Sequence, residues 1–240
     1  MQRLFPAAGP LDDDGLVEAY RFSGRHLRVN FVAALDGAIS VEGRSGGLGS
    51  PGDRRVFRTL RALADAVLVG AGTAAAEGYR PIFPDSAVGV LRTRLGRPAV
   101  APIVVVSRQG SLSPDDQLVR NALVPTVLVT CAAADPARRA ALTAAGADVL
   151  VCGDDAVELP AAVDALADRG LEQLVCEGGP ALFRAALDAG VVDELDLTIA
   201  PLLVGGGPGL LPSALADPRR TELRQVLTED DVLFTRYALR

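Results

Sequence analysis

The sequence predicts an α/β protein with a mostly parallel central sheet, helices on both faces and an antiparallel edge formed by the C-terminal strands. Short apolar runs that read as strands alternate with amphipathic stretches that read as helices, which is the pattern of right-handed parallel βαβ units. Several runs are apolar throughout, as is typical of strands covered on both faces. The last two runs have no long helix between them, so an antiparallel pair is expected.

Composition restricts the class of protein. The chain has 240 residues, of which 49% are hydrophobic and 22% charged, ordinary values for a soluble globular protein with a sizeable core. A net charge of −6 argues against a nucleic-acid partner and against an anionic membrane surface. We recognise no signal peptide and no apolar run of about 18 residues, so a soluble cytoplasmic protein is expected.

No metal site is expected. Cys131, Cys152 and Cys176 lie in apolar, strand-like runs and lack metal-type spacing, so they are predicted to be small core residues. His26 is the single histidine, which excludes a multi-histidine metal site.

The chain is predicted to hold an N-terminal arm over residues 1–26 and one domain over residues 27–240. Residues 28–35 form the first central strand, which ends at Asp36 and is followed by a Gly/Ser-rich loop over 43–52. Ligands of open α/β sheets bind beyond the carboxyl ends of such strands. Spacing alone favours Asp36 as a turn residue over a catalytic carboxylate.

The remaining elements follow in chain order. Four arginines on the first helix of the domain are interpreted as a solvated face, with a phosphate-bearing substrate as the alternative. The expected elements are a short helix near 16–20, helix 53–64, strand 66–73, a loop-like stretch 78–100, strands 101–108 and 126–131, helix 136–145, strand 148–153, helix 159–169, strand 171–176, helix 180–189 and strands 194–203 and 232–239.

The stretch around Gly178 and Gly179 organises the chain. A buried strand runs through Glu177 and the two glycines into a helix that begins at Pro180, a residue suited to the first helical position. Free N–H groups at a helix N-terminus, and glycines that allow close approach, suit a dinucleotide pyrophosphate. A tight turn without a ligand explains the same residues equally well, because the full G-x-G-x-x-G pattern is absent.

Two further strand ends carry polar groups. Gly72 and Thr73 lie where the strand that begins at residue 66 runs into a glycine turn. They are interpreted either as contacts to a nucleotide phosphate or as the cap of a helix. Ser107 and Arg108 end the next strand. A hydroxyl beside a guanidinium can bind a ribose 2′-phosphate, although a plain strand exit looks the same.

Four motifs recur together and in order: residues 32–37, 65–73, 177–180, and 192–195 with 200–206. Together they resemble the reductase domain of the riboflavin-biosynthesis deaminase/reductase, a member of the dihydrofolate-reductase-like superfamily. The resemblance runs from about residue 27 to the C-terminus and implies the three-layer fold of that superfamily. It also implies an NADPH-dependent reductase, which transfers hydride to the ribose C1′ of 5-amino-6-(5-phosphoribosylamino)uracil.

The resemblance assigns roles to cofactor-side residues. Val32 and Ala33 would line the nicotinamide, and Ser107 with Arg108 would select the 2′-phosphate. Gly72, Thr73 and Glu77 match other cofactor-side positions. The pyrophosphate turn would comprise Gly178, Gly179, Pro180, Ala181 and Leu182.

On the substrate side, Ser45 and Arg61 match contact positions, and Glu177 matches the carboxylate that meets the base. Asp36 is a candidate for orienting substrate or a proton-delivering water, so Asp36 and Glu177 are the catalytic candidates. The family's usual bis-aspartate segment is replaced by residues 77–81, in which Arg80 is the candidate for the ribose phosphate. The zinc deaminase motifs H-x-E and P-C-x-x-C are absent from this sequence, so deamination is not expected.

Two alternatives remain open from the sequence. The first is a paralogous reductase of a dihydropterin or dihydrofolate, which the altered 77–81 segment favours. The second is a non-catalytic nucleotide-binding module. Because family members are commonly homodimers, a homodimer is expected, with residues 191–203 as a sheet edge that a partner would cover.

Overall fold

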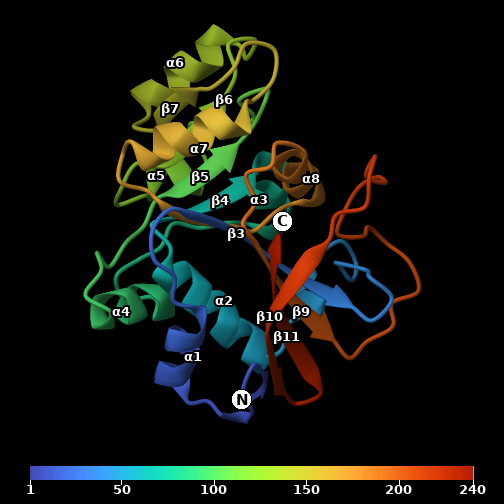
Figure 1. The fold of residues 1–240 in the computed structure, drawn as a ribbon. Coiled ribbons are helices and arrows are strands. Elements are labelled where there is room, and N and C mark those ends of the chain that lie inside the picture. The colour runs from blue at the N-terminus through green and yellow to red at the C-terminus, as the bar shows by residue number, and fades with distance from the viewer. Residues whose placement is uncertain (240) are drawn as a thin grey trace.

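The computed structural model describes residues 1–239, and within them one mixed sheet carries the whole fold (Figure 1). Its strand order is β2-β1-β10-β11-β9-β3-β8-β4-β5-β6-β7. From β9 to β7 neighbouring strands are parallel, and from β2 to β9 they are antiparallel. The predicted mostly parallel sheet with an antiparallel C-terminal part is therefore confirmed.

The elements have the following bounds. The strands are β1 (Gln2–Phe5), β2 (Gly9–Pro10), β3 (His26–Ala34), β4 (Ala66–Gly70), β5 (Ile103–Val106), β6 (Val127–Thr130), β7 (Asp148–Val151), β8 (Gln173–Cys176), β9 (Glu194–Ala200), β10 (Thr221–Glu229) and β11 (Val232–Leu239). The helices are α1 (Asp13–Tyr20), α2 (Pro51–Leu63), α3 (Ala71–Glu77), α4 (Ala87–Arg94), α5 (Gln117–Arg120), α6 (Pro136–Ala144), α7 (Leu159–Ala167) and α8 (Pro180–Asp188), with a 3₁₀ turn over Ser45–Gly47.

Two apolar cores lie on opposite faces of the sheet, which gives the three predicted layers. Buried side chains of α1 to α6 pack against one set of strand residues, which includes Val67, Val105 and Val175. Buried side chains of α7 and α8 pack against the alternate set, which includes Leu68, Val104 and Leu174. Because successive strand residues point to opposite faces, strands that are apolar throughout supply both cores.

Three predictions about single elements are corrected. Strand β4 ends at Gly70, and the glycine turn expected to follow it is the first turn of α3. The stretch 78–100 contains α4 and is not loop throughout. Strand β10, whose burial pattern shows no clear alternation, was not predicted, and its charged and polar residues explain why. The arm over 1–26 contributes β1 and β2 to the sheet, where β1 pairs with β10.

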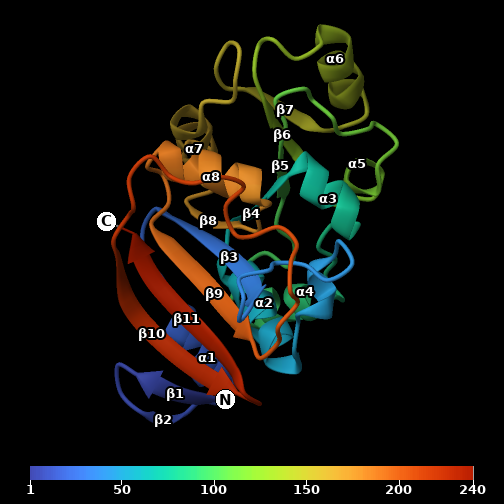
Figure 2. The ribbon, with the colours of Figure 1, turned by 90° about the vertical axis from the view of Figure 1, so that its right-hand side faces the viewer.

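The expectation that residues 191–203 form a sheet edge is wrong. Strand β9 lies between β3, parallel to it, and β11, antiparallel to it (Figure 2). Its partners are therefore strands of the same chain. The homodimer itself stays a prediction.

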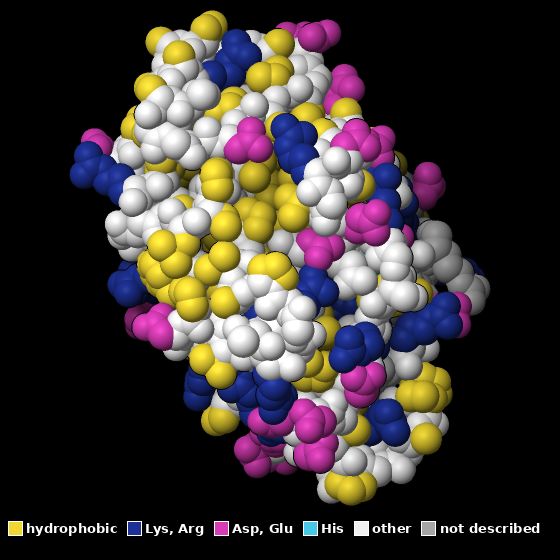
Figure 3. All heavy atoms as spheres, turned by 90° about the vertical axis from the view of Figure 1, so that its left-hand side faces the viewer, with side chains coloured by type: hydrophobic (Ala, Val, Ile, Leu, Met, Phe, Trp, Pro, Cys, Tyr) yellow, Lys and Arg dark blue, Asp and Glu magenta, His cyan; other side chains and the backbone are white. Residues whose placement is uncertain are grey.

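The surface beside α4 carries charges of both signs (Figure 3), and the cysteines lie in the core, as the sequence predicted. On the side of α4, acidic and basic side chains lie interspersed (Figure 3), and ion pairs such as Arg94 with Asp14 join α4 to α1 there. All three cysteines are free and buried, as predicted, and burial raises the pKa of the Cys176 thiol to about 12. Within residues 1–239 no helix is long and apolar enough to span a bilayer.

Candidate active site

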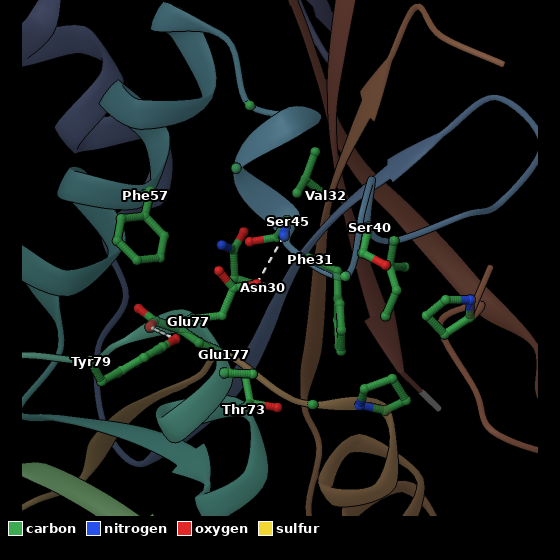
Figure 4. Close-up of a pocket in the computed structure, with 18 of the residues that line it drawn as sticks. Asn30, Phe31, Val32, Ser40, Ser45, Phe57, Thr73, Glu77, Tyr79 and Glu177 are labelled. Atoms are coloured by element: carbon green, nitrogen blue, oxygen red, sulfur yellow. Dashed lines mark hydrogen bonds between the residues drawn. The ribbon is translucent and has the colours of Figure 1, made fainter. Parts of the chain in front are cut away.

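A cavity of about 450 Å³ lies beyond the carboxyl ends of β3, β8 and β4. It is lined by residues of β3, of the 43–49 loop, of the first turns of α2, of α3 and of the Gly178–Gly179 turn (Figure 4). This is the edge of a parallel sheet at which ligands bind. The sequence predicted the ligand site at this edge.

The Gly178–Gly179 turn packs closely against the start of α3. The Gly70 N–H donates to the Gly178 carbonyl at 2.8 Å. A Cβ on Gly179 would lie 2.4 Å from Oγ1 of Thr73. Gly178 has a φ of +82°, and a Cβ there would lie 2.8 Å from the Phe31 ring. Both positions therefore require glycine for space, and Gly178 also for its backbone conformation.

Two helices begin at this turn without a side-chain cap. The N-cap residues are Gly70 for α3 and Gly179 for α8, and neither offers a side-chain acceptor. By contrast, Ser50 caps α2 by accepting from the Asp53 N–H at 3.0 Å. The first N–H groups of α3 and α8 are left for another acceptor, as a phosphate group would supply.

Glu177 is held by a buried ion pair. The Arg61 guanidinium donates from Nε to Oε1 and from Nη2 to Oε2, each at 2.7 Å, and the Tyr79 hydroxyl donates to Oε2 at 2.6 Å. The carboxylate side chain is 3% exposed. Burial alone would lower the pKa of Arg61, but the charge and hydrogen bonds of Glu177 raise it above its usual value. Burial, followed by the Glu177 charge, raises the pKa of Tyr79.

Aromatic rings complete this cluster. The Arg61 guanidinium lies 4.3 Å from the centroid of the Phe57 ring and 5.2 Å from that of Tyr79, within the range of cation–π attraction. Phe57, Tyr79 and Glu177 line the cavity. Both charge-assisted hydrogen bonds of Arg61 go to Glu177. Arg61 and Glu177, which the sequence predicted to contact substrate, therefore form one ion-paired unit.

Glu77 fixes the glycine-rich loop. Its Oε1 accepts from the Ser45 N–H at 2.8 Å, a bond that joins α3 to the 3₁₀ turn (Figure 4). Both residues line the cavity. The Glu77 carboxylate therefore attaches the loop over 43–49 to α3, the helix whose start packs against the Gly178–Gly179 turn.

Asp53 is a third carboxyl group of the cavity, and the sequence did not single it out. It lies in the first turn of α2, half-buried, near the hydroxyl of Thr198 on β9. Burial raises the pKa of Asp53, and the Thr198 hydroxyl and the Arg54 charge oppose this only in part. A Cβ on Gly49 would lie 3.3 Å from Oδ2 of Asp53.

The structure brings together many, but not all, of the predicted site residues. Val32, Ser45, Gly72, Thr73, Glu77, Glu177, Gly179 and Pro180 line the cavity. Gly178 shapes the turn, while Ala33 and Leu182 lie in the core beneath it. Ala181 and Arg80 are exposed and are not among the lining residues.

Asp36 lies outside the cavity lining. Its carboxylate accepts from the N–H groups of Val204 at 2.9 Å and Gly205 at 2.6 Å. The Gly205 bond is the main cause of its lowered pKa. Asp36 thus joins the end of β3 to the glycine-rich 205–209 loop, in line with the turn interpretation made from spacing.

Arg108 lines a second hollow, beyond β5 and β6, whereas Ser107 is buried and is not among the lining residues. This hollow measures about 400 Å³, and Arg108, Asp135 and Arg138 are among its lining residues. Arg108 Nε donates to the Asp155 carbonyl at 2.8 Å, and Ser107 Oγ accepts from the Ser111 N–H at 2.9 Å. Arg138 was not predicted, because it comes from α6 and not from a strand end.

Other lining residues were also missed. They come from β3, α2, the segment after α3 and a distant loop, which the fold alone brings together. They include Asn30, Phe31, Asp53, Phe57, Tyr79 and Pro208, whereas Arg54 is one of the four helix arginines for which a phosphate-bearing substrate was the alternative. Ser50 and Asp53 mark the start of a helix by their spacing, but no sequence signal shows that Asp53 faces a cavity.

Comparison with known proteins agrees with this geometry. Residues 25–232 match the model of the RibD C-terminal domain family. The chain belongs to this family. It is 31% identical to the 2,5-diamino-6-ribosylamino-4(3H)-pyrimidinone 5′-phosphate reductase of Methanothermobacter thermautotrophicus, over 90% of this chain and 98% of that protein.

Two more relatives bear on size and fold. The riboflavin biosynthesis protein RibD of Bacillus amyloliquefaciens is 28% identical over 80% of this chain, which spans about half (49%) of that protein. A pyrimidine reductase-like protein of Corynebacterium diphtheriae superposes with a TM-score of 0.75, at 27% identity, over 90% of this chain and 92% of that one.

The superfamily fold is also supported. Dihydrofolate reductase of Enterococcus faecalis superposes with a TM-score of 0.52 over 90% of this chain and 96% of that one. At 16% identity this likeness concerns the fold alone. The family and the dihydrofolate-reductase-like fold predicted from the four motifs are confirmed.

Proposed function

We propose that this member of the RibD C-terminal domain family reduces an aminopyrimidine that carries a ribosyl 5-phosphate, with NADPH as the hydride donor. The observation that carries the proposal is the Gly178–Gly179 turn, packed against Thr73 at the mouth of a cavity with three carboxyl groups. Two uncapped helix starts meet there. Two relatives, matched over 98% and 82% of their own lengths, are named as reductases of such a pyrimidine.

The order of the strands supports the placement of a dinucleotide. The carboxyl ends of β3, β8, β4, β5 and β6 follow one another along one edge of the sheet. A nicotinamide would lie at Val32, the pyrophosphate at Gly179 and Thr73, and the adenosine 2′-phosphate at Arg108 and Arg138. Cβ atoms at positions 178 and 179 would clash with their neighbours. The two glycines therefore leave the backbone bare, which would let a pyrophosphate approach it closely.

On the substrate side, the chain's own residues bind and orient. Glu177, immobilised by Arg61, presents its fixed carboxylate oxygens as acceptors to donor groups of the pyrimidine. Among the described lining residues Arg54 is the one cation, and none of its side-chain atoms has a hydrogen bond or ion pair. Because Arg61 is neutralised, Arg54 is the candidate for the substrate phosphate. When bound, the reduced nicotinamide supplies the hydride, and the protein aligns C1′ with it.

Steady-state NADPH oxidation tests this proposal. Three substrates are compared: the 2,5-diaminopyrimidinone ribosyl phosphate named for the archaeal relatives, 5-amino-6-(5-phosphoribosylamino)uracil, and dihydrofolate. We expect turnover of the phosphorylated aminopyrimidines. Turnover of dihydrofolate alone would contradict the proposal and favour a dihydropterin-type reductase, whereas tight NADPH binding without any turnover would favour a non-catalytic module.

A further inference from the structure

The proposed reduction needs a proton as well as a hydride. The C1′–O4′ bond of the ribosylamine first opens, and the proton of its nitrogen passes to O4′, which leaves an open-chain C1′=N imine. When hydride adds to C1′ of this imine, the electron pair of the C1′=N bond goes to nitrogen, which must take up a proton to become the amine. Three carboxyl groups of the described residues line the cavity, namely Asp53, Glu77 and Glu177. The hydrogen-bond partners of the three carboxyl groups differ, and these differences indicate which group can donate a proton.

Two of these carboxyl groups are engaged elsewhere. Glu177 accepts two charge-assisted hydrogen bonds from Arg61 and one from Tyr79, so that both of its oxygens are occupied. Glu77 accepts from the Ser45 backbone N–H and holds the loop in place. Both carboxyl groups are thus held in place by donor groups of the protein. Neither is suited to carry a proton to the substrate.

Asp53 has a different environment. It lines the cavity, forms no ion pair with the described residues, and lies near the hydroxyl of Thr198. Thr198 is 2% exposed and lies on β9 opposite Val32 of β3, one of the residues at the predicted nicotinamide position. The half-buried Asp53 side chain therefore lines the cavity on the side of Thr198 and Val32.

We propose that Asp53 is the proton donor of the reduction: its carboxyl protonates the substrate nitrogen as hydride reaches C1′. The resulting carboxylate is reprotonated by water through the open cavity. This inference rests on the proposed function. It adds a catalytic residue that neither the sequence motifs nor the relatives' names point to.

The charges around Asp53 determine how it titrates. Arg54 lies beside it on the same helix and lowers its pKa, as does the Thr198 hydroxyl, while burial raises it more strongly. The charged and titratable groups on the elements packed around it are Arg54 of α2, Glu77 and Tyr79 at the end of α3, Glu177 after β8, Asp196 of β9 and Glu229 of β10.

The first experiment measures kcat against pH for the wild-type chain and for Asp53→Asn, which keeps the shape of the side chain. A general acid must be protonated, so the wild-type kcat is expected to fall as pH rises through the pKa of Asp53. In Asp53→Asn we expect a loss of kcat by about 100- to 10,000-fold, no such fall with pH, and an unchanged Kd for NADPH. Asp188→Asn, an exposed carboxyl on α8, is the control and keeps the wild-type profile.

A second variant tests the same carboxyl through its partner. Thr198→Val removes the hydroxyl that lowers the pKa of Asp53, so the fall in kcat should move to higher pH. A merely structural role of Thr198 would lower kcat without moving the profile. Carbon-13 NMR of the ligand-free chain, with Asp53→Asn used for assignment, should show Asp53 titrating above the ordinary aspartate range, about 3.9.

The outcomes are distinguishable. If wild type turns over no phosphorylated aminopyrimidine, the proposed function fails and the role of Asp53 fails with it. If wild type is active and Asp53→Asn keeps both its kcat and its pH profile, only the role of Asp53 is refuted. A raised KM with unchanged kcat would show that Asp53 binds the ring and does not protonate it. An ordinary titration of Asp53 in the NMR experiment also overturns the proposal.

Discussion

Replacement of Arg61 by methionine tests whether the Arg61–Glu177 pair holds the substrate side of the cavity together. The variant keeps most of the side-chain volume but leaves the Glu177 carboxylate, whose side chain is 3% exposed, with the Tyr79 hydroxyl as its remaining side-chain partner. Breaking a buried ion pair by removing one partner costs about 3–5 kcal/mol. The lost contacts with the Phe57 and Tyr79 rings add to this loss.

The expected loss is large enough to measure by thermal unfolding. For a chain of this size each kcal/mol shifts Tm by roughly 2–4 °C, so Arg61→Met should unfold on the order of 6–20 °C below wild type. The matched control is Arg94→Met. Its ion pair with Asp14 is exposed on the surface, and such pairs contribute less than about 1 kcal/mol.

A double-mutant cycle separates the interaction energy of the Arg61–Glu177 pair from the cost of the cavity that each substitution leaves. Arg61→Met and Glu177→Leu together remove both charges, and we expect the double variant to be more stable than Arg61→Met alone, because no unpaired carboxylate remains. The reasoning is refuted if Arg61→Met is no less stable than Arg94→Met, or if the two substitutions at the pair are simply additive.

Four further predictions concern binding and pH. Arg54→Gln should raise KM for the phosphorylated pyrimidine and leave NADPH affinity unchanged, whereas Gly179→Ala should abolish NADPH binding in a fluorescence titration, because its Cβ would lie 2.4 Å from Thr73 Oγ1. Arg108→Gln should weaken NADPH more than NADH, which lacks the 2′-phosphate, and equal weakening of both would remove its assigned role. Burial, with Glu194 next in order, raises the pKa of Asp196, so the folded state holds more protons than the unfolded chain and stability is lost as pH rises from about 4. Urea unfolding across pH should show this loss in wild type and not in Asp196→Asn, and equal slopes in the two proteins would contradict it.

The sequence by itself predicted the class of fold and the edge of the sheet at which the cavity lies. Strand β8, the glycines at 178 and 179 and Pro180 at the start of α8 were all predicted, because apolar runs, glycine turns and helix starts are local properties of the chain. The four motifs supplied the family. Strand β10 escaped because its charged and polar residues carry no clear period, and α4 because prolines and glycines surround it.

Only the tertiary structure decided which polar groups meet. Arg61 and Glu177 are 116 positions apart, and nothing in their local sequence shows that each neutralises the other. The sequence predicts Asp53 only as part of a helix start, whereas the fold brings Thr198 of β9 near its carboxyl. The sequence offers Asp36 as a catalytic candidate, whereas in the structure its carboxylate accepts hydrogen bonds from the backbone N–H groups of residues 204 and 205. Local sequence sets backbone geometry, whereas burial and charge pairing depend on contacts between distant elements, and those contacts decide which carboxyl can carry a proton.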